Sequence, residues 1–227
     1  MTKRTMKRLG FAIAIGAVAG TAGIGVLHTS FARPLLAKIG GCPIGKGTAA
    51  EIENARMVGV VATRGTERAP ARPAFGFTLD AASPEDVRDW ASRHQLDCKD
   101  KREGLFVTCH DVPLAALGRV GETGRVDEVS FAFRPRDRRL VNVTATSFAL
   151  SSDVAAERMS ASVARLGTEL GPPAIAAGDA TADSLGRGNY ATATVEYRYS
   201  DFMAEVTATG LGDRGVALRE HYISAID

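Results

Sequence analysis

Two cysteines have the spacing in this chain that best supports a specific chemistry. Cys98 and Cys109 enclose Lys99–Thr108, with Glu103 and Gly104 at the centre of this stretch. A hairpin folded there would put the cysteines on facing strands, at a Cα separation of about 4.5–5.5 Å that suits a disulfide. A redox pair normally uses the C-x-x-C spacing, which the sequence lacks. We therefore predict a structural bond between Cys98 and Cys109.

The third cysteine, Cys42, has no predicted partner in the chain. It follows Ile39-Gly40-Gly41, a superficial likeness to the lipobox of diacylated proteins. However, Arg33 and Lys38 separate Cys42 from the apolar segment that a lipobox must adjoin. Lipidation, an intermolecular disulfide and a free thiol are the three interpretations, and we favour the free thiol.

Catalytic and cofactor motifs are missing from the sequence. It has no G-x-S-x-G elbow and no H-E-x-x-H, and Gly47 occupies the place where a phosphate-binding loop needs Ser or Thr. His94 and His221 are interpreted as structural, because neither has a neighbouring set of ligands or a nucleophile. Glu205 and Glu220 could approach each other across the last hairpin, but ordinary strand acids explain them as well. We predict no catalytic residue, no cofactor and no metal.

The amino-terminal segment determines where the chain works. An apolar run, Leu9–Leu27, follows a basic cluster made of Lys3, Arg4, Lys7 and Arg8. The basic cluster stays in the cytoplasm while the apolar run enters the bilayer, so the rest is expected outside the cytoplasm. The run is closer to the roughly 20 residues of a spanning helix than to the about 7–15 of a signal peptide. Ser30-Phe31-Ala32 would nevertheless allow cleavage after Ala32, so residues 1–32 are either a signal-anchor or a signal peptide.

Small residues recur in the apolar run at a spacing typical of helix packing in membranes. Ala12, Gly16 and Gly20 are four residues apart. Such a row lets two helix backbones approach closely in lipid. We predict that it packs against another single-pass helix, which favours a retained anchor in the inner (cytoplasmic) membrane with a periplasmic domain. Cleavage would instead release the protein into the periplasm.

Charge argues against a nucleic acid partner. The chain has a formal net charge of +2 and a pI of about 8.5. That basic balance comes from residues 1–32, which contain four bases and no acid, so the remainder is slightly acidic. Nucleic acid binding needs a concentrated basic face, and the sequence does not provide one.

Residues 33–74 are predicted to be a tether, with a short helix from Thr48 to Met57 and a linker over 64–73, so that the compact domain begins at Phe75. Beyond it, two helices are expected from their caps and apolar periodicity, one following Ser83 and one from Ser152 to Gly171. Alternating apolar residues predict strands at 75–79, 129–133, 141–145, 191–199, 204–208 and 216–222.

The sequence predicts that the domain consists of two related halves, 75–148 and 149–227. Phe77-Thr78-Leu79 and Phe148-Ala149-Leu150 each end shortly before a helix that precedes a predicted meander. We predict an α+β fold of tandem modules, each a helix packed on an antiparallel meander. In outline this resembles the helix-plus-meander modules of secreted inhibitor and envelope-assembly proteins, although no motif establishes kinship.

Three classes of function fit these observations. The first is a non-catalytic accessory or assembly subunit, anchored in the bilayer and exposing its domain to a larger membrane complex. The second is a secreted periplasmic binding module or inhibitor, which requires cleavage after Ala32. The third is an envelope enzyme whose site is dispersed along the chain; a pocket that gathers histidine or acidic groups would favour it.

Overall fold

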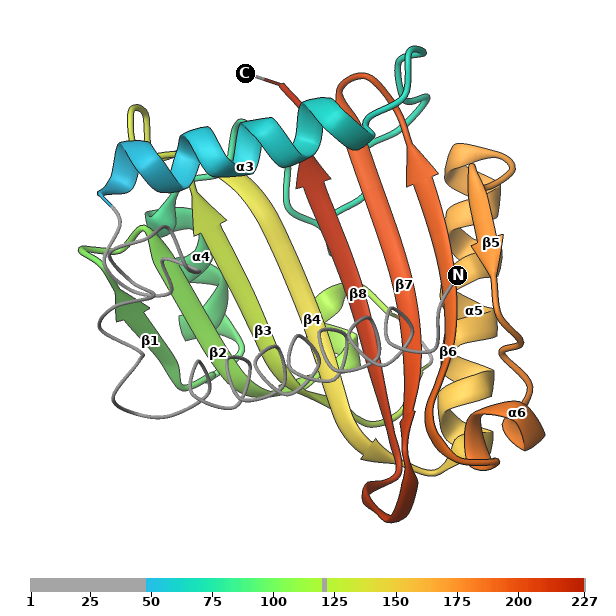
Figure 1. The fold of residues 1–227 in the computed structure, drawn as a ribbon. Helices are drawn as coiled ribbons and strands as arrows, with labels where there is room; N and C mark the ends of the chain where they lie inside the picture. Colours follow the sequence, from blue (N-terminus) through green and yellow to red (C-terminus); the bar gives the residue numbers. More distant parts are fainter. Residues whose placement is uncertain (1–47, 120–121, 227) are drawn as a thin grey trace, which may run out of the picture. The chain divides into compact units, whose positions relative to one another are not determined.

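The computed structural model describes residues 48–119 and 122–226 of the chain (Figure 1). The predicted packing row of Ala12, Gly16 and Gly20 lies outside these residues, as does Cys42. Within the described ranges, no helix has the length and hydropathy needed to cross a membrane. The described part is an α+β unit built on one large antiparallel sheet.

One eight-stranded antiparallel sheet forms the centre of the structure, in the order β1-β2-β3-β4-β8-β7-β6-β5 (Figure 1). The predicted strands at 129–133, 141–145, 191–199, 204–208 and 216–222 are all part of it. Its strands are β1 Cys98–Lys101, β2 Phe106–Pro113, β3 Arg125–Phe133, β4 Leu140–Leu150, β5 Ile175–Ala177, β6 Asn189–Arg198, β7 Phe202–Leu211 and β8 Val216–Ser224.

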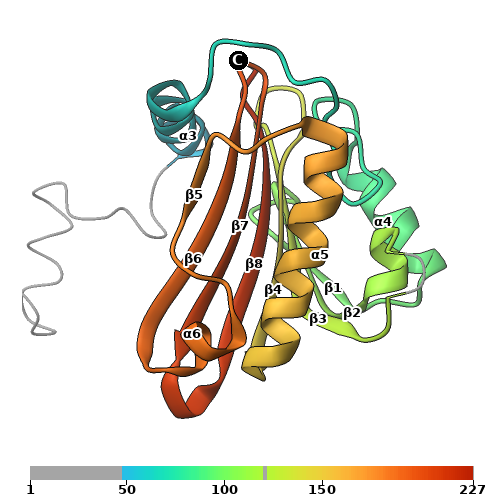
Figure 2. The same cartoon turned by 90° about the vertical axis from the view of Figure 1, so that its right-hand side faces the viewer.

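The helices cover the two faces of this sheet unequally. Figure 2 shows α4 and α5 on one face, and α3 on the opposite face near one end of the strands. The helices of the described part are α3 Ala49–Thr63, α4 Pro84–Arg93, α5 Ser152–Leu170 and the short α6 Ala182–Gly186, with 3-10 turns η1 Leu114–Leu117 and η2 Gly212–Arg214. α3 extends beyond the predicted end at Met57, and the compact unit begins at Ala49 rather than at Phe75.

α4 has the start that its sequence predicts. Ser83 accepts a hydrogen bond from the Asp86 backbone and Asp86 returns one, forming a capping box before Pro84. Val87, Trp90 and Ala91 are buried, and the Trp90 indole nitrogen donates to the Ala116 carbonyl at 3.0 Å. The helical spacing of Val87, Trp90, Ala91 and His94 in the sequence predicts that His94 lies on the same buried face, and this prediction is wrong. The helix ends at Arg93, so His94 is the exposed C-cap residue.

α5 packs on the same face of the sheet as α4. Its buried side chains are Ala155, Met159, Ser162, Leu166 and Leu170, which recur every three or four residues. Gly171, at φ 85°, ends the helix as predicted, because this left-handed conformation costs glycine little. The apolar periodicity of the sequence also predicts a buried Val163, but Val163 is only partly buried and its neighbour Ser162 is fully buried instead.

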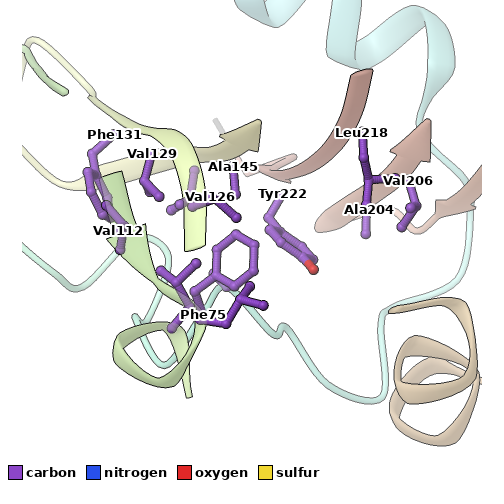
Figure 3. Packing of buried hydrophobic residues seen from close by; sticks show 14 of the residues in the cluster. Phe75, Val112, Val126, Val129, Phe131, Ala145, Ala204, Val206, Leu218 and Tyr222 are labelled. Carbon is purple, nitrogen blue, oxygen red and sulfur yellow. The ribbon is translucent and has the colours of Figure 1, made fainter. Parts of the chain in front are cut away.

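Residues 75–79 do not form the predicted strand. They lie in a chain of turns, with Phe75 at φ 55° and Asp80 at φ 62°. Phe75 enters the core, where its ring packs edge-on against Tyr222 at a centroid distance of 4.8 Å (Figure 3). Asp80 accepts a hydrogen bond from the Ser224 hydroxyl at 2.6 Å and pairs with Arg72 and Arg134. The apolar alternation therefore reflects contacts with the sheet and not a strand within it.

A charged cluster lies buried between β8 and α5. Glu220 pairs with Arg119, and it accepts hydrogen bonds from Ser162 at 3.0 Å, Tyr222 at 2.7 Å and Arg165 at 3.1 Å. Arg119 also lies over the Phe75 ring, 5.6 Å from its centroid. A buried carboxylate is tolerated only when paired and hydrogen-bonded, and these contacts supply both. Burial, with the nearby Glu220 charge, raises the pKa of Tyr222 far above its usual value, so the phenol stays protonated and donates.

The Cys98–Cys109 disulfide is present and joins β1 to β2, consistent with the prediction. The two cysteines are directly opposite in the strand register, with Cα atoms 4.0 Å apart. The turn between the strands uses Arg102, Glu103 and Gly104, all at positive φ. Cys109 is fully buried, so the bond attaches the edge strand to the core.

Replacing both Cys98 and Cys109 with alanine should lower the free energy of unfolding. Eleven positions separate the cysteines, and a loop of that length corresponds to about 3 kcal/mol in the chain-entropy model. Urea denaturation of the non-reduced proteins measures the change, and Cys42→Ser is the control expected to leave the midpoint unchanged. An unchanged midpoint for the double variant would show that the bond does not stabilise the fold.

Glu220→Gln should destabilise the protein by about 3–5 kcal/mol, because it leaves the buried guanidinium of Arg119 and the partly exposed one of Arg165 without their carboxylate. The matched variant is Glu205→Gln on β7, whose pair with Arg219 is partly exposed and should contribute about 1 kcal/mol or less. Chemical denaturation of both variants gives the comparison. Equal losses of unfolding free energy in the two variants would mean that the buried Glu220 cluster stabilises the fold no more than the partly exposed Glu205–Arg219 pair does.

Candidate binding face

The sheet has a second face, directed away from α4 and α5, which we call the open face. Strand alternation places side chains of the two faces in turn along β7, where residues from Phe202 to Leu211 alternate between buried and half-buried. Residues on the open face of the four central strands include Ser130, Asn142, Thr144, Thr146, Glu205, Thr207, Thr209, Arg219 and His221. This face is polar, whereas the other face contains the core.

Hydroxyl side chains are paired across neighbouring strands of the open face. Thr194 and Thr207 are hydrogen-bonded between β6 and β7 at 3.2 Å, and Thr108 and Ser130 between β2 and β3 at 3.4 Å. Thr144 donates to the Asn142 side chain at 3.1 Å. Cross-strand threonine pairs stabilise a sheet without an apolar cover, so this face does not need a helix along its whole length.

α3 covers one end of the open face but packs loosely on it. Val60 is its only fully buried residue. Between α3 and the sheet lie a cavity of about 540 Å³ and a smaller one of about 210 Å³, and Arg56 and Asn142 line both. Arg56 attaches the helix to the sheet by donating to the Ser224 carbonyl at 2.8 Å, and it also pairs with Glu53 at 2.7 Å.

His221 lies in the larger cavity, on β8. Its Nε2 is 2.7 Å from the Asn142 amide nitrogen, whose side-chain oxygen already accepts from Thr144. The amide therefore donates to Nε2, and the imidazole has its proton on Nδ1. Burial and the positive charge of Arg219 lower the pKa of His221 from 6.5 to about 4, although Glu205 opposes this shift. The ring is neutral at physiological pH.

Glu205 is the acidic neighbour of His221 across the β7–β8 register. Burial raises its pKa, but hydrogen bonds from Thr207 and Arg219 outweigh this and leave the pKa below its usual value. Glu205 is thus an ion-paired carboxylate beside a weakly basic imidazole. General acid–base catalysis favours groups with a pKa near the working pH, and neither group is shifted that way. The arrangement is better suited to hydrogen bonding with a polar partner.

Glu205 and Glu220 do not approach each other, which corrects the expectation from the last hairpin. Glu205 is paired in register with His221, whereas Glu220 is paired with Val206. Adjacent strand positions point to opposite faces, so Glu205 is on the open face and Glu220 is in the core. The sequence analysis did not predict the residues that surround these groups, namely Asn142, Arg119 and Arg165. Their partners are far away in sequence, and only the period-2 pattern of β8 indicated that its polar residues would be divided between the faces.

A larger groove of about 970 Å³ lies on the helical side, between residues 75–82 and α4. Phe77 and Trp90 line it, and Asp86 and Asp89 contribute acidic groups. Trp90 already donates to Ala116, and Asp86 already caps α4. The groove therefore has aromatic walls whose polar groups are largely engaged within the fold.

Comparison with known proteins adds no functional assignment: no family model, no curated protein and no solved structure matches this chain. Within residues 48–119 and 122–226, no group of histidine, cysteine and acidic residues is arranged to bind a metal ion. The open face and the cavities beneath α3 are thus the features from which a function can be argued.

His221 should make folding stability depend on pH. Because its pKa is about 4 in the folded protein against 6.5 ordinarily, the unfolded state binds more protons between these values. Stability is therefore greatest above about pH 6.5 and falls towards about pH 4, by on the order of 2–3 kcal/mol from this group. Urea denaturation across that range should show a smaller fall for His221→Gln, whose amide oxygen can still accept from Asn142. Identical pH profiles would refute the buried neutral state.

Proposed function

We propose that this protein is a non-catalytic accessory or assembly subunit, anchored in the inner membrane by its amino-terminal helix. Its α+β domain then lies on the periplasmic side and binds a protein partner of a larger membrane complex through the open face. The observation that supports this most is the asymmetry of the sheet: among the helices of residues 48–119 and 122–226, α4 and α5 cover one face, while α3 alone lies on the other (Figure 2).

The open face has the dimensions of a protein interface. At about 4.8 Å between strands and about 3.3 Å per residue, the six longer strands, β2 to β4 and β6 to β8, measure roughly 29 Å by 30 Å, or about 900 Å² including the end that α3 covers. A standard complex buries about 800 Å² on each partner. This face has paired hydroxyl and charged groups, such as Thr194 with Thr207 and Glu205 with Arg219. These polar groups keep the protein soluble before the face binds its partner. They also provide hydrogen-bonding groups for a polar partner surface.

We further infer that residues 75–148 and 149–227 are tandem modules. The supporting feature is the sheet order, in which β1–β4 and β5–β8 each form a meander and meet at β4 and β8. A helix precedes each meander, α4 before β1 and α5 before β5. Both helices are on the same face, which leaves the open face continuous across the two modules.

The secreted binding module or inhibitor is the second candidate, and the same open face supports it. The two candidates differ in residues 1–32, which an anchor retains and a signal peptide loses. Mass spectrometry of the mature amino terminus distinguishes them. A protein that begins at Arg33 is secreted, and the membrane complex is then excluded.

Arginine substitutions on the open face should remove the partner from the protein purified out of native membranes in mild detergent. Thr146→Arg and Thr209→Arg place a large charge on half-buried positions of β4 and β7, away from α3. Copurifying subunits, identified by mass spectrometry, should be lost from both variants. Gly16→Leu with Gly20→Leu should weaken the association separately, since close packing of helices in lipid needs small residues.

Thr168→Arg is the matched control, because it makes the same change at an exposed position of α5 on the helical side. It should retain every copurifying subunit. Circular dichroism melting of all variants separates lost binding from lost folding. An unaccompanied protein from every detergent, with its amino terminus intact, would contradict the proposed function.

A further inference from the structure

The second half of α3 presents an apolar surface to solvent. Residues 57–63 contain no charged side chain, and of these only Val60 is fully buried. Val58 is 64% exposed and Val61 is 55% exposed. Positions three residues apart are neighbours on a helix, so the two valines form one patch, and the exposed Ala62 extends it. The first half of the same outer surface is polar, with Glu51 and Asn54.

The patch faces away from the sheet. An amphipathic helix normally directs its apolar residues to the core and its charges to water. α3 follows this rule only in part: Val60 is buried and Ile52 lines the smaller cavity, but Arg56 and Glu53 share that side while Val58 and Val61 are exposed. The two cavities beneath the helix leave part of its sheet side unfilled.

We propose that the Val58–Val61 patch of α3 rests on the surface of the lipid bilayer that the amino-terminal helix enters. This inference rests on the proposed anchor, and it adds a second, interfacial contact of the domain with lipid. An interfacial helix lies in the membrane plane with its apolar residues among the headgroups and upper acyl chains. Val58 and Val61 fit that position without any change in the fold.

The length of the chain before α3 supports the bilayer as the occupant of the patch. Residues 28–48 separate the end of the apolar run from Ala49. The tether that the sequence predicts there would span about 25 Å on average if it behaved as a random coil, a length that would keep α3 within reach of the bilayer surface. Such a connection gives α3 a high effective concentration near the bilayer surface. A contact made by only two valines, which would be weak in a free protein, can then be populated.

The consequence for the domain is a defined orientation. With α3 at the lipid surface, the strand ends beneath it lie near the membrane, and the start of β6 at the opposite end of the sheet points into the periplasm (Figure 1). The open face then stands beside the bilayer, where the external part of a membrane complex is found.

Fluorescence from single labelled cysteines in the full chain tests the contact. Cys42→Ser removes the free thiol, and Val58→Cys then receives an environment-sensitive dye. The protein is reconstituted in vesicles of phosphatidylethanolamine and phosphatidylglycerol that contain a nitroxide lipid. The dye at position 58 should shift to the blue and be quenched by the nitroxide lipid. Adding Val61→Glu should abolish both effects, because a buried carboxylate opposes insertion.

Two further positions make every outcome decisive. Tyr190→Cys is the matched control, since Tyr190 is 73% exposed and is the second residue of β6, at the other end of the sheet; its dye should not be quenched. Ala17→Cys reports on the anchor itself. Quenching at 17 without quenching at 58 would overturn the interfacial contact alone, whereas no quenching at 17 would contradict the proposed anchor. A blue shift at 58 that grows with protein concentration, without lipid quenching, would assign the patch to a second copy of the chain and overturn the inference.

Discussion

Pairing between β4 and β8 is the interaction on which the rest of the structure depends. It runs from Asn142 opposite Ile223 to Leu150 opposite Val216 and joins two meanders into one sheet. Without it, each half would be a four-stranded sheet with one helix, too small to bury much apolar surface. With it, the core extends without interruption from Phe131 beneath α4 to Val206 beneath α5 (Figure 3).

The same pair of strands determines the chemistry of both faces. Consecutive residues of β8 point in opposite directions, so Glu220 and Tyr222 enter the core while His221 enters the cavity beneath α3. On the core side, Arg119 and Arg165 pair with the charge of Glu220. The open side has a neutral imidazole, paired hydroxyls and partly exposed ion pairs. A one-residue slip in the register of β8 would exchange these environments and bury the wrong groups. The buried cluster therefore also specifies the register.

The segment before α4 shows how a chain without regular structure becomes part of a core. Residues 64–82 are fixed by contacts made one at a time: the Ala69 backbone donates to Asp201 at 2.9 Å, Phe75 packs on Tyr222, and Asp80 binds Ser224. Because the same segment continues from α3, these contacts also position α3 at its end of the sheet. The loosely packed helix is thus oriented more by its connections than by its own buried surface.

Local patterns in the sequence determined the strands β3, β4, β6, β7 and β8, the caps of α4 and α5, and the spacing of Cys98 and Cys109, because alternation, capping and hairpin geometry act over a few residues. Only the tertiary structure decided that Phe75 lies in a turn, that His94 is exposed, and that Glu205 and Glu220 lie on opposite faces. Those outcomes depend on where a helix ends and on how β7 and β8 pair. The partners of Glu220 show the reason most clearly: Arg119 is separated from it by 101 positions, and nothing near either residue in the sequence indicates that the two will meet.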